Sequence, residues 1–334
     1  YAQLGDFVMA AELLGEVAAY RRSELGLEVQ DTLSSIQNLA IFMKLQGRVD
    51  AAESLYLEIL EPQKRVAGND HPITIGLMQN LADLYSEQGR YTEAEPIYAE
   101  AIVLFRRVFG EGHPHTARIR SNFANMYKSM GRLDEAELLY VESLAVIREL
   151  LGDTHVEALR AGVNLAELRV MQSKFTDAET LLLQIEEAGR NTLGEGHAVT
   201  LKAQSQLIDV YRATDRNDAA RELTVQVLEQ HRIRASAPDA SPQEKFLFAS
   251  NLLTCEPADL RDPPTALEFA SAANADTGAK DPRFLRVLAM AYHQNGDGAK
   301  AVETQERALG VLPETAVDVR EEMVAELNVY AGSP

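Results

Sequence analysis

Histidine is the residue type in this sequence that most directly suggests chemistry, because imidazole can ligate a metal or move a proton near neutral pH. Four of the histidines recur every 42 residues, and one of these, His113, is followed by Pro114 and a further histidine, His115. The recurring positions are His71, His113, His155 and His197. Zinc needs its ligands about 2.1 Å from one centre, so histidines on successive repeats cannot share one metal. We therefore predict no metal site, and we expect each recurring histidine to cap the helix that follows it.

The other motifs that could carry catalysis lack the context that catalysis needs. The stretches GEGHPH and GEGHAV begin like a phosphate-binding glycine loop, but the third glycine is replaced by His115 and Val199, and no strand precedes either stretch. The catalytic signatures H-R-D, D-F-G, G-x-S-x-G and H-E-x-x-H do not occur. The only cysteine, Cys255, lies in an apolar stretch, where we expect a buried structural thiol rather than a nucleophile. We expect no catalytic residue and no cofactor in this chain.

A column of carboxamides is the stronger candidate for a binding surface. Each member directly precedes a pair of core residues, and the members are Asn38, Asn80, Asn122, Asn164 and Gln206. A carboxamide both donates and accepts hydrogen bonds, so this ladder could hold the backbone of an extended peptide. Alternatively, each side chain could bond to the neighbouring repeat and set the pitch of the repeat array. The sequence leaves both interpretations open.

Basic residues accompany the carboxamides on the same predicted helices. They stand four residues before or six residues after the carboxamide, at Arg118, Arg160, Lys202, Lys44, Lys128 and Arg212. Residues at i and i+4 share a helix face, so these cations should line one groove. Arginine grips carboxylates bidentately, which favours a protein or peptide partner that is acidic. The alternative is pairing inside the protein with the neighbouring acids Asp83, Glu87, Glu167 and Asp209.

The same period defines the elements that must position these side chains. Glycines mark the ends of the units, at Gly26, Gly68, Gly110, Gly152 and Gly194. Within one unit, apolar residues recur at helical spacing before Gly89 and again between Tyr91 and Gly110. Glycine ends a helix readily because it can adopt positive φ. Each unit therefore predicts two helices, and the chain predicts an all-α solenoid in which every unit packs on its neighbours.

One unit carries a family resemblance. The stretch NLADLYSEQGRYTEAEPIY resembles the tetratricopeptide signature of large, small, aromatic, small and aromatic residues, here Leu81, Ala82, Tyr85, Ala94 and Tyr98. The 42-residue period and the sequence GNDHPIT resemble the repeats of kinesin light chains, over Tyr1 to about Arg234. The resemblance implies a right-handed solenoid of helix-turn-helix units. It also implies that the first helices line a concave groove that binds a peptide or partner protein.

The register changes after about Arg234, where ASAPDASPQ predicts a linker. The stretches NLLTCEPADLRDPPTALEFASAA and LAMAYHQNGDGAKAVETQERAL follow. With them, the region from Gln206 to Pro313 resembles the repeat tails of bacterial serine/threonine protein kinases. This resemblance implies an alternative function, a regulatory or substrate-docking tail whose catalytic domain lies upstream. The predicted organisation is the second helix of a truncated repeat at 1–25, five 42-residue repeats at 26–234, two divergent repeats at 235–313, and a capping helix and tail at 314–334.

Both ends of the chain carry expectations about packing. Tyr1 aligns with Tyr85 and Tyr127, so we expect the first helix of its repeat to lie upstream. In the last helix we expect an inner face with Val317, Val324 and Leu327. The outer face is expected to carry mostly acids, at Asp318, Glu321, Glu322 and Glu326.

Composition excludes several classes of partner. The chain has 334 residues with 32 basic and 51 acidic side chains, a formal net charge of −19. Nucleic-acid binding needs a basic footprint, and an acidic membrane surface repels such a chain. No apolar run approaches the length of about 18 residues that spans a bilayer. A single cysteine excludes an intrachain disulfide and fits a reducing compartment, so we expect a cytoplasmic protein.

Overall fold

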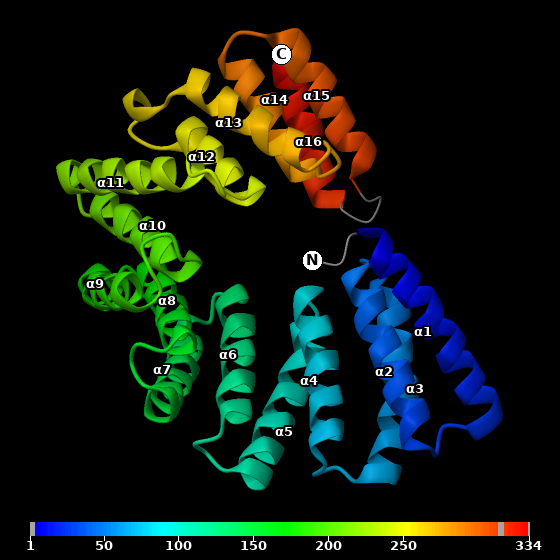
Figure 1. The fold of residues 1–334 in the computed structure, drawn as a ribbon. Coiled ribbons are helices and arrows are strands. Elements are labelled where there is room, and N and C mark those ends of the chain that lie inside the picture. Colours follow the sequence, from blue (N-terminus) through cyan, green and yellow to red (C-terminus); the bar gives the residue numbers. More distant parts are fainter. Residues whose placement is uncertain (1–3, 313–316, 333–334) are drawn as a thin grey trace. The chain divides into compact units, whose positions relative to one another are not determined.

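The computed structural model describes the backbone of residues 4–312 and 317–332, and the side chains of 13–312 and 319–332. Over these ranges the chain is all-helical, with sixteen α-helices, one short 3-10 helix and no strand. The helices divide between two compact units, Tyr1–Lys174 and Phe175–Pro334 (Figure 1). The predicted all-α fold is therefore confirmed, and the two units are described in turn.

Unit 1 is a regular alternation of shorter and longer helices. Its first helices have 16 residues, α2 (Gln30–Leu45), α4 (Pro72–Glu87), α6 (Pro114–Ser129) and α8 (Val156–Met171). The second helices have 19 residues, α3 (Val49–Ala67), α5 (Tyr91–Phe109) and α7 (Leu133–Leu151). Helix α1 (Leu4–Leu25) precedes them. Each helix packs on the next along the chain, so the repeat in the sequence becomes a repeat in space.

Unit 2 begins with the same alternation and then departs from it. Helices α10 (Ala198–Ala213) and α11 (Asn217–Ala235) keep the lengths of 16 and 19 residues seen in unit 1, and α9 (Phe175–Thr192) is one residue shorter than the second helices there. The later helices are shorter, α12 (Pro242–Thr254), α13 (Pro263–Asp276), α14 (Pro282–Gln294), α15 (Gly298–Val311) and α16 (Val317–Tyr330). A 3-10 turn, η1 (Ala258–Leu260), occupies the longer loop between α12 and α13. The shorter helices follow the change of register in the sequence.

The turn between the two helices of each 42-residue repeat requires a residue with positive φ. Gly89 takes this conformation with φ of 72° and ends α4. Two later 42-residue repeats place Ser173 and Asp215 at the equivalent position, both with φ of 59°. A side chain at positive φ is strained, less so for Asp than for Ser, because Asp is enriched in this region. The turn is thus conserved in geometry where glycine is absent.

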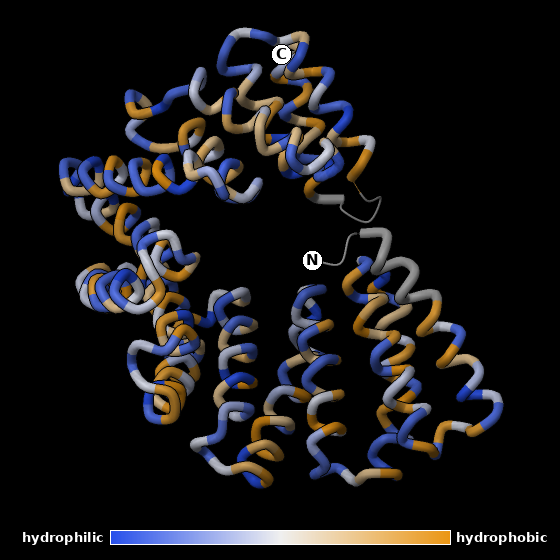
Figure 2. The backbone as a smooth tube through the Cα atoms, in the orientation of Figure 1, coloured by the Kyte–Doolittle hydropathy of each residue, from blue (hydrophilic) through white to orange (hydrophobic). Residues whose placement is uncertain are grey.

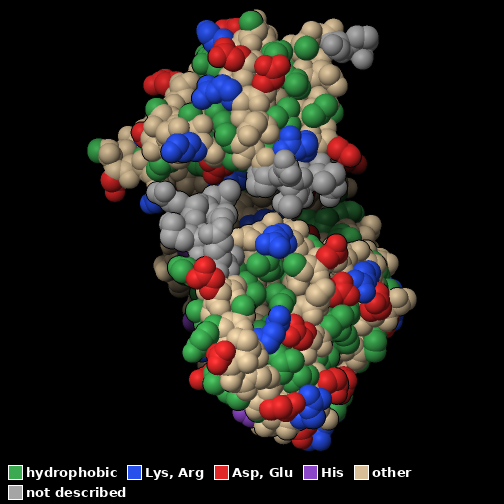
Figure 3. All heavy atoms as spheres, turned by 90° about the vertical axis from the view of Figure 1, so that its right-hand side faces the viewer, with side chains coloured by type: hydrophobic (Ala, Val, Ile, Leu, Met, Phe, Trp, Pro, Cys, Tyr) green, Lys and Arg blue, Asp and Glu red, His purple; other side chains and the backbone are tan. Residues whose placement is uncertain are grey.

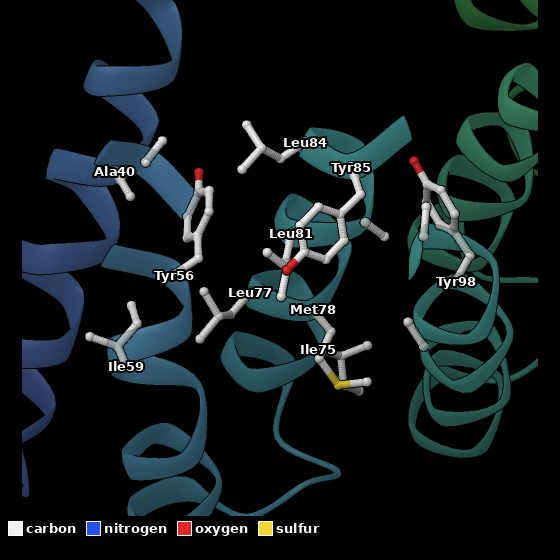
Figure 4. Packing of buried hydrophobic residues seen from close by; sticks show 14 of the residues in the cluster. Ala40, Tyr56, Ile59, Ile75, Leu77, Met78, Leu81, Leu84, Tyr85 and Tyr98 are labelled. Atoms are coloured by element: carbon white, nitrogen blue, oxygen red, sulfur yellow. The ribbon is translucent and has the colours of Figure 1, made fainter. Parts of the chain in front are cut away.

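The predicted signature residues build the core of unit 1. Leu81, Ala82, Tyr85, Ala94 and Tyr98 are all buried. Figure 4 shows the side chains of α4 enclosed between α3 and α5, with the tyrosine rings standing between neighbouring helices. Figure 2 shows apolar and polar positions alternating along each helix, which is the pattern expected of amphipathic helices packed on one face.

The inner face of α16 differs from the prediction. Met323 is buried, whereas Val324 is 42% exposed. Glu326, expected on the outside, turns inward, where it pairs with Arg286 at 2.7 Å and accepts a hydrogen bond from Gln305 at 2.9 Å. Glu321 and Glu322 are exposed and Leu327 is half-buried, as expected. The prediction was wrong for Val324 and Glu326, because an inward acid is stable when it is paired and the sequence pattern does not reveal that partner.

Several predictions fall on residues that the structure does not describe. Tyr1, the boundary between residues 313 and 314, and the side chains of Val317 and Asp318 all lie outside the described residues. The domain boundaries at 25, 234 and 313 stay predictions.

Candidate functional site

The histidine column caps helices in both units. The backbone amide of Ile73 donates to Nδ1 of His71 at 3.2 Å, and that of His115 donates to Nδ1 of His113 at 3.1 Å. The same bond recurs at His155, with Glu157 at 3.2 Å, and at His197, with Val199 at 3.3 Å. Each bond satisfies one of the amides that a helix N-terminus leaves without a partner. The prediction that these histidines cap the following helix is confirmed.

His113 and His115 form an aromatic cluster with α5. The His113 ring stacks on Phe109 with centroids 4.5 Å apart, and the His115 ring lies 5.9 Å from that of Phe105. Burial, followed by the charges of Arg118 and His113, lowers the pKa of His115, which favours the neutral ring. No group of three or more metal-ligating side chains occurs among the described residues. The pair therefore packs and caps.

The carboxamide ladder lies on the surface formed by α2, α4, α6 and α8, which we call the first-helix face of unit 1. One of its members is engaged inside the protein. Asn122 on α6 donates through Nδ2 to both oxygens of Asp83 on α4, at 3.1 and 3.2 Å. The Tyr98 hydroxyl also donates to Asp83, and Gln79 donates at 3.4 Å. Burial raises the pKa of Asp83, and these three donors oppose that shift. At this position the carboxamide links two repeats.

The other asparagines of the ladder are available. Asn38 is exposed, while Asn80 and Asn164 are half-buried. Within the described part of the chain, none of the three makes a side-chain hydrogen bond. Asn122 therefore fits the interpretation in which the carboxamide bonds to the neighbouring repeat. The carboxamides of Asn38, Asn80 and Asn164 remain free to bind a peptide backbone.

Most of the cations on the first-helix face of unit 1 are paired with acids. Lys44 binds Glu87 at 2.7 Å, and Lys128 binds Glu167 at 3.0 Å, so each pair joins consecutive first helices. Arg160 pairs with Glu157 on its own helix at 3.0 Å. Arg118 is exposed and forms no ion pair with any described side chain. Three of the four predicted cations in this unit thus have an acidic partner within the chain.

Unit 2 contains a cleft of about 430 Å³ on its first helices, lined by α10, α11 and α12. We call it the cationic cleft. Its polar rim is Lys202, Ser205, Asp209, Arg212, Asn251 and Glu256, and its apolar wall includes Leu201, Ile208, Val227, Leu228 and Leu247. The structure brings the predicted cations Lys202 and Arg212 together here. The third predicted residue of this unit, Gln206, is buried at 6% exposure and does not line the cleft.

The two cations of the cleft differ in their partners. Lys202 is exposed and forms no ion pair with any described side chain. Arg212 donates to the carbonyl oxygen of Glu256 at 2.6 Å, and its guanidinium lies 3.9 Å from the carboxylate of Asp209. Burial raises the pKa of Asp209, and the charges of Arg212 and Lys202 oppose that shift. The cleft therefore holds two cations and two acids, and the carboxylate of one of these acids, Glu256, is paired with Arg261 outside the cleft lining.

Two further cleft residues were not predicted to take part in binding. His231 is buried, and this burial lowers its pKa, so the neutral ring is favoured. Cys255 is half-buried at the end of α12 rather than fully buried as expected. Burial raises its pKa, which disfavours the thiolate, so it is not an activated nucleophile. Periodicity could not find Cys255, because α12 lies beyond the point where the 42-residue register ends. His231 lies on α11 within that register, but outside the recurring histidine column.

Antiparallel helix pairs repeated along the chain, with polar side chains on the first helices, define a helical repeat scaffold. The chain belongs to the tetratricopeptide repeat family. A family model described as tetratricopeptide repeat matches residues 31–102, 74–149 and 121–187, and a second model of the same description matches residues 282–307. Members of this family are generally non-catalytic, and the fold supports a role as a protein–protein interaction scaffold.

Solved structures extend the likeness. A protein from Podosopora anserina, described as a kinesin light chain with nearly identical TPR-like repeats, is 25% identical with a TM-score of 0.54, covering 58% of this chain and 92% of its own. Yeast Tom70 is 14% identical with a TM-score of 0.63, covering 98% of this chain and 59% of its own. Apo RapI is 13% identical with a TM-score of 0.53, covering 84% and 97%. The last two show the fold alone.

Three further findings concern curated relatives, the resemblance to kinase tails and membrane-spanning helices. No curated protein matches this chain. Neither family model is that of a kinase, so the resemblance to kinase tails stays a prediction. Among the described helices, none is both long enough and apolar enough to cross a membrane.

Proposed function

We propose that this protein is an interaction scaffold that holds an extended, carboxylate-bearing segment of a partner protein, and that the cationic cleft of unit 2 anchors it. The observation that carries the proposal is the state of Lys202 and Arg212. Both line one cleft, and neither forms a close ion pair, since the nearest carboxylate to Arg212 lies 3.9 Å away. A carboxylate that binds here gains charge-assisted hydrogen bonds without breaking an existing short ion pair.

The remainder of the cleft fits the chain that carries such a carboxylate. Leu201, Ile208 and Leu247 supply an apolar wall beside the cations. Asn251 and Ser205 supply a carboxamide and a hydroxyl that can bond to a peptide backbone. Ligand sites of proteins commonly combine an apolar lining with a few convergent polar groups. The cleft is thus suited to a short acidic stretch with neighbouring apolar side chains.

Unit 1 supports a secondary contribution. Its free carboxamides Asn38, Asn80 and Asn164, together with the unpaired Arg118, lie on first helices that offer donors for an extended backbone. Its lysines are already bound to Glu87 and Glu167. We therefore assign the anchoring charge to unit 2, and to unit 1 a weaker role based on hydrogen bonds.

The test is a fluorescence anisotropy titration of the 334-residue chain with two labelled peptides, one alternating Glu and Leu and one alternating Gln and Leu. We expect the Glu peptide to bind more tightly and to lose affinity as salt is added, because salt screens exposed charges. Lys202→Glu with Arg212→Glu should weaken its binding about tenfold or more, as expected when charge-assisted hydrogen bonds are lost.

Arg221→Glu is the matched control, because Arg221 is also an exposed cation of unit 2, pairs with Asp259 at 2.8 Å and does not line the cleft. It should leave the affinity for the Glu peptide nearly unchanged. Equal affinity for the Glu and Gln peptides, or equal loss in Arg221→Glu and in the double variant, would contradict the proposal.

A further inference from the structure

The outward surface of unit 1 carries an apolar stripe on each of two second helices. On α5 the exposed residues Pro96, Ala99 and Val103 follow each other at helical spacing. On α7 the exposed residues are Leu138, Val141 and Ala145. Val103 is 49% exposed and Leu138 is 62% exposed. A contiguous exposed apolar patch of this kind commonly marks an interaction surface.

The stripes are specific to these two repeats. At the positions equivalent to Pro96 and Val103, α3 carries Ser54 and Glu61, and α9 carries Thr180 and Glu187. All four of these residues are exposed, as expected for a solvated helix surface. Polar side chains therefore occupy the first and last positions in the neighbouring repeats, while the middle position, equivalent to Ala99, carries the exposed residues Leu57 and Leu183. Only α5 and α7 are apolar at all three positions. The fold itself does not require apolar residues there.

The surface beside the α5 stripe is hollow. A depression of about 970 Å³ lies between α5 and the loop formed by residues 67–72, and Ala99, Val103 and Leu104 form its apolar side. It has room for the side chains of a second helix laid along α5. Small residues such as Ala99 allow the close approach of about 8–10 Å at which helices pack.

We propose that unit 1 pairs with a second copy of this chain, with α5 of each copy packed antiparallel on α7 of the other. This arrangement is a two-fold interface, in which each contact occurs twice. In the register that we propose, Val103 lies opposite Leu138, Pro96 opposite Ala145, and Ala99 beside Val141. Both stripes are then covered along their whole length.

The same register brings opposite charges together. Arg106 then lies opposite Glu135, Arg107 opposite Asp134, and Glu93 opposite Arg148. The register was set by covering the apolar stripes and not by these charges, so the charge pattern supports it independently. Complementary charges of this kind fix the register of an interface and exclude other partners.

These six charged residues have partners within the chain, but the pairs are exposed. Arg107 binds Asp70 at 3.3 Å with both side chains more than half exposed, and Arg106 binds Glu111 at 3.3 Å in a similar setting. Exposed pairs contribute little to stability, so they can exchange partners at small cost when the second copy arrives. On the face drawn in Figure 3, acidic and basic side chains lie interspersed.

The test is sedimentation velocity of the purified chain over a range of concentrations. We expect the mass of two copies, and we expect Val103→Glu with Leu138→Glu to give single chains with an unchanged circular dichroism spectrum. Leu183→Glu is the matched control, since Leu183 is a 45% exposed leucine on α9 outside the proposed interface. It should leave the dimer intact.

A charge exchange tests the register itself. Arg106→Glu with Arg107→Glu should weaken the dimer about tenfold, in the range measured for interfacial charge pairs. Adding Asp134→Arg and Glu135→Arg in the same chain should restore it. A wild-type chain that stays single, a dimer that survives Val103→Glu with Leu138→Glu, dissociation of the Leu183→Glu control, or failure of the charge exchange to restore the dimer would each overturn the proposal.

Discussion

The two units of this protein use the same repeat to place cations on their first helices, but they leave those cations in different states. In unit 1, Lys44 and Lys128 form ion pairs of 3.0 Å or less with acids of the next first helix. In unit 2, Lys202 has no ion pair among the described residues, and Arg212 lies 3.9 Å from its nearest acid. Among the cations of unit 1, only Arg118 lacks an ion pair with a described side chain. A basic column in the sequence is therefore a candidate binding surface only where the neighbouring helix does not supply the counter-charge.

The largest expected difference between the units is the loss of stability when Asp83 of unit 1 or Asp209 of unit 2 is replaced. Asp83→Ala should lower the free energy of unfolding by about 3 kcal/mol, because it leaves Tyr98, Gln79 and Asn122 without their buried acceptor. Asp209→Ala should cost less than about 1 kcal/mol, since its nearest cation is loosely placed. Urea denaturation followed by circular dichroism measures both. Equal losses would remove the distinction between the units.

The pH dependence of the Asp83 effect has a definite sign. Burial raises its pKa above the ordinary value of 3.8, so the folded state binds the proton more readily than the unfolded state. Its contribution is fully present below pH 3.8 and falls as the pH rises through the raised pKa of the folded protein. The destabilisation by Asp83→Ala should therefore be greater at the acidic end of this window than at pH 7. A loss that grows toward pH 7 would contradict this assignment.

The histidine caps should be equivalent in the two units, unlike the cations. His113→Ala in unit 1 and His197→Ala in unit 2 should each cost about 1 kcal/mol, the usual value of an N-terminal cap. Thermal unfolding measures the two losses side by side. His113 also stacks on Phe109, so a larger loss at His113 would assign the excess to that contact.

Substitutions in the turns of the repeat should stabilise the chain, unlike the preceding ones, and by a smaller amount. Ser173→Gly should stabilise the chain by about 0.5 kcal/mol, because glycine takes the observed positive φ without strain. Asp215→Gly should gain less, since aspartate already tolerates this conformation. A loss of stability at Ser173→Gly would show that the serine side chain makes a contact that outweighs the strain.

Removing the acids that pair with Lys44 and Lys128 should leave these two lysines of unit 1 without an ion pair, as Lys202 is in the cationic cleft. Glu87→Ala with Glu167→Ala frees Lys44 and Lys128, and we expect affinity for the Glu-Leu peptide to rise about two- to threefold, the scale of an exposed charge pair. Ser86→Ala with Ser129→Ala is the control, because it alters first helices without freeing a cation. An unchanged affinity in the double Glu variant would show that Lys44 and Lys128 do not contribute to binding even when they lack their acidic partners.

Much of this fold could be predicted from the sequence, because the 42-residue period carries both the helix caps and the core. The histidine caps and the buried signature residues from Leu81 to Tyr98 follow directly from local spacing. The state of each cation could not be predicted, since it depends on which acid the next first helix places within reach. The lining of the cleft by α12 and the inward turn of Glu326 arise beyond the regular register, where periodicity no longer aligns residues.

Hydrogen–deuterium exchange of the chain with and without the Glu-Leu peptide tests the central claim most directly. We expect added peptide to slow amide exchange in α10 and α12, which line the cationic cleft, more than in α4 and α6. Protection confined to α4 and α6, with exchange in α10 and α12 unchanged, would contradict the assignment of the anchoring site to unit 2.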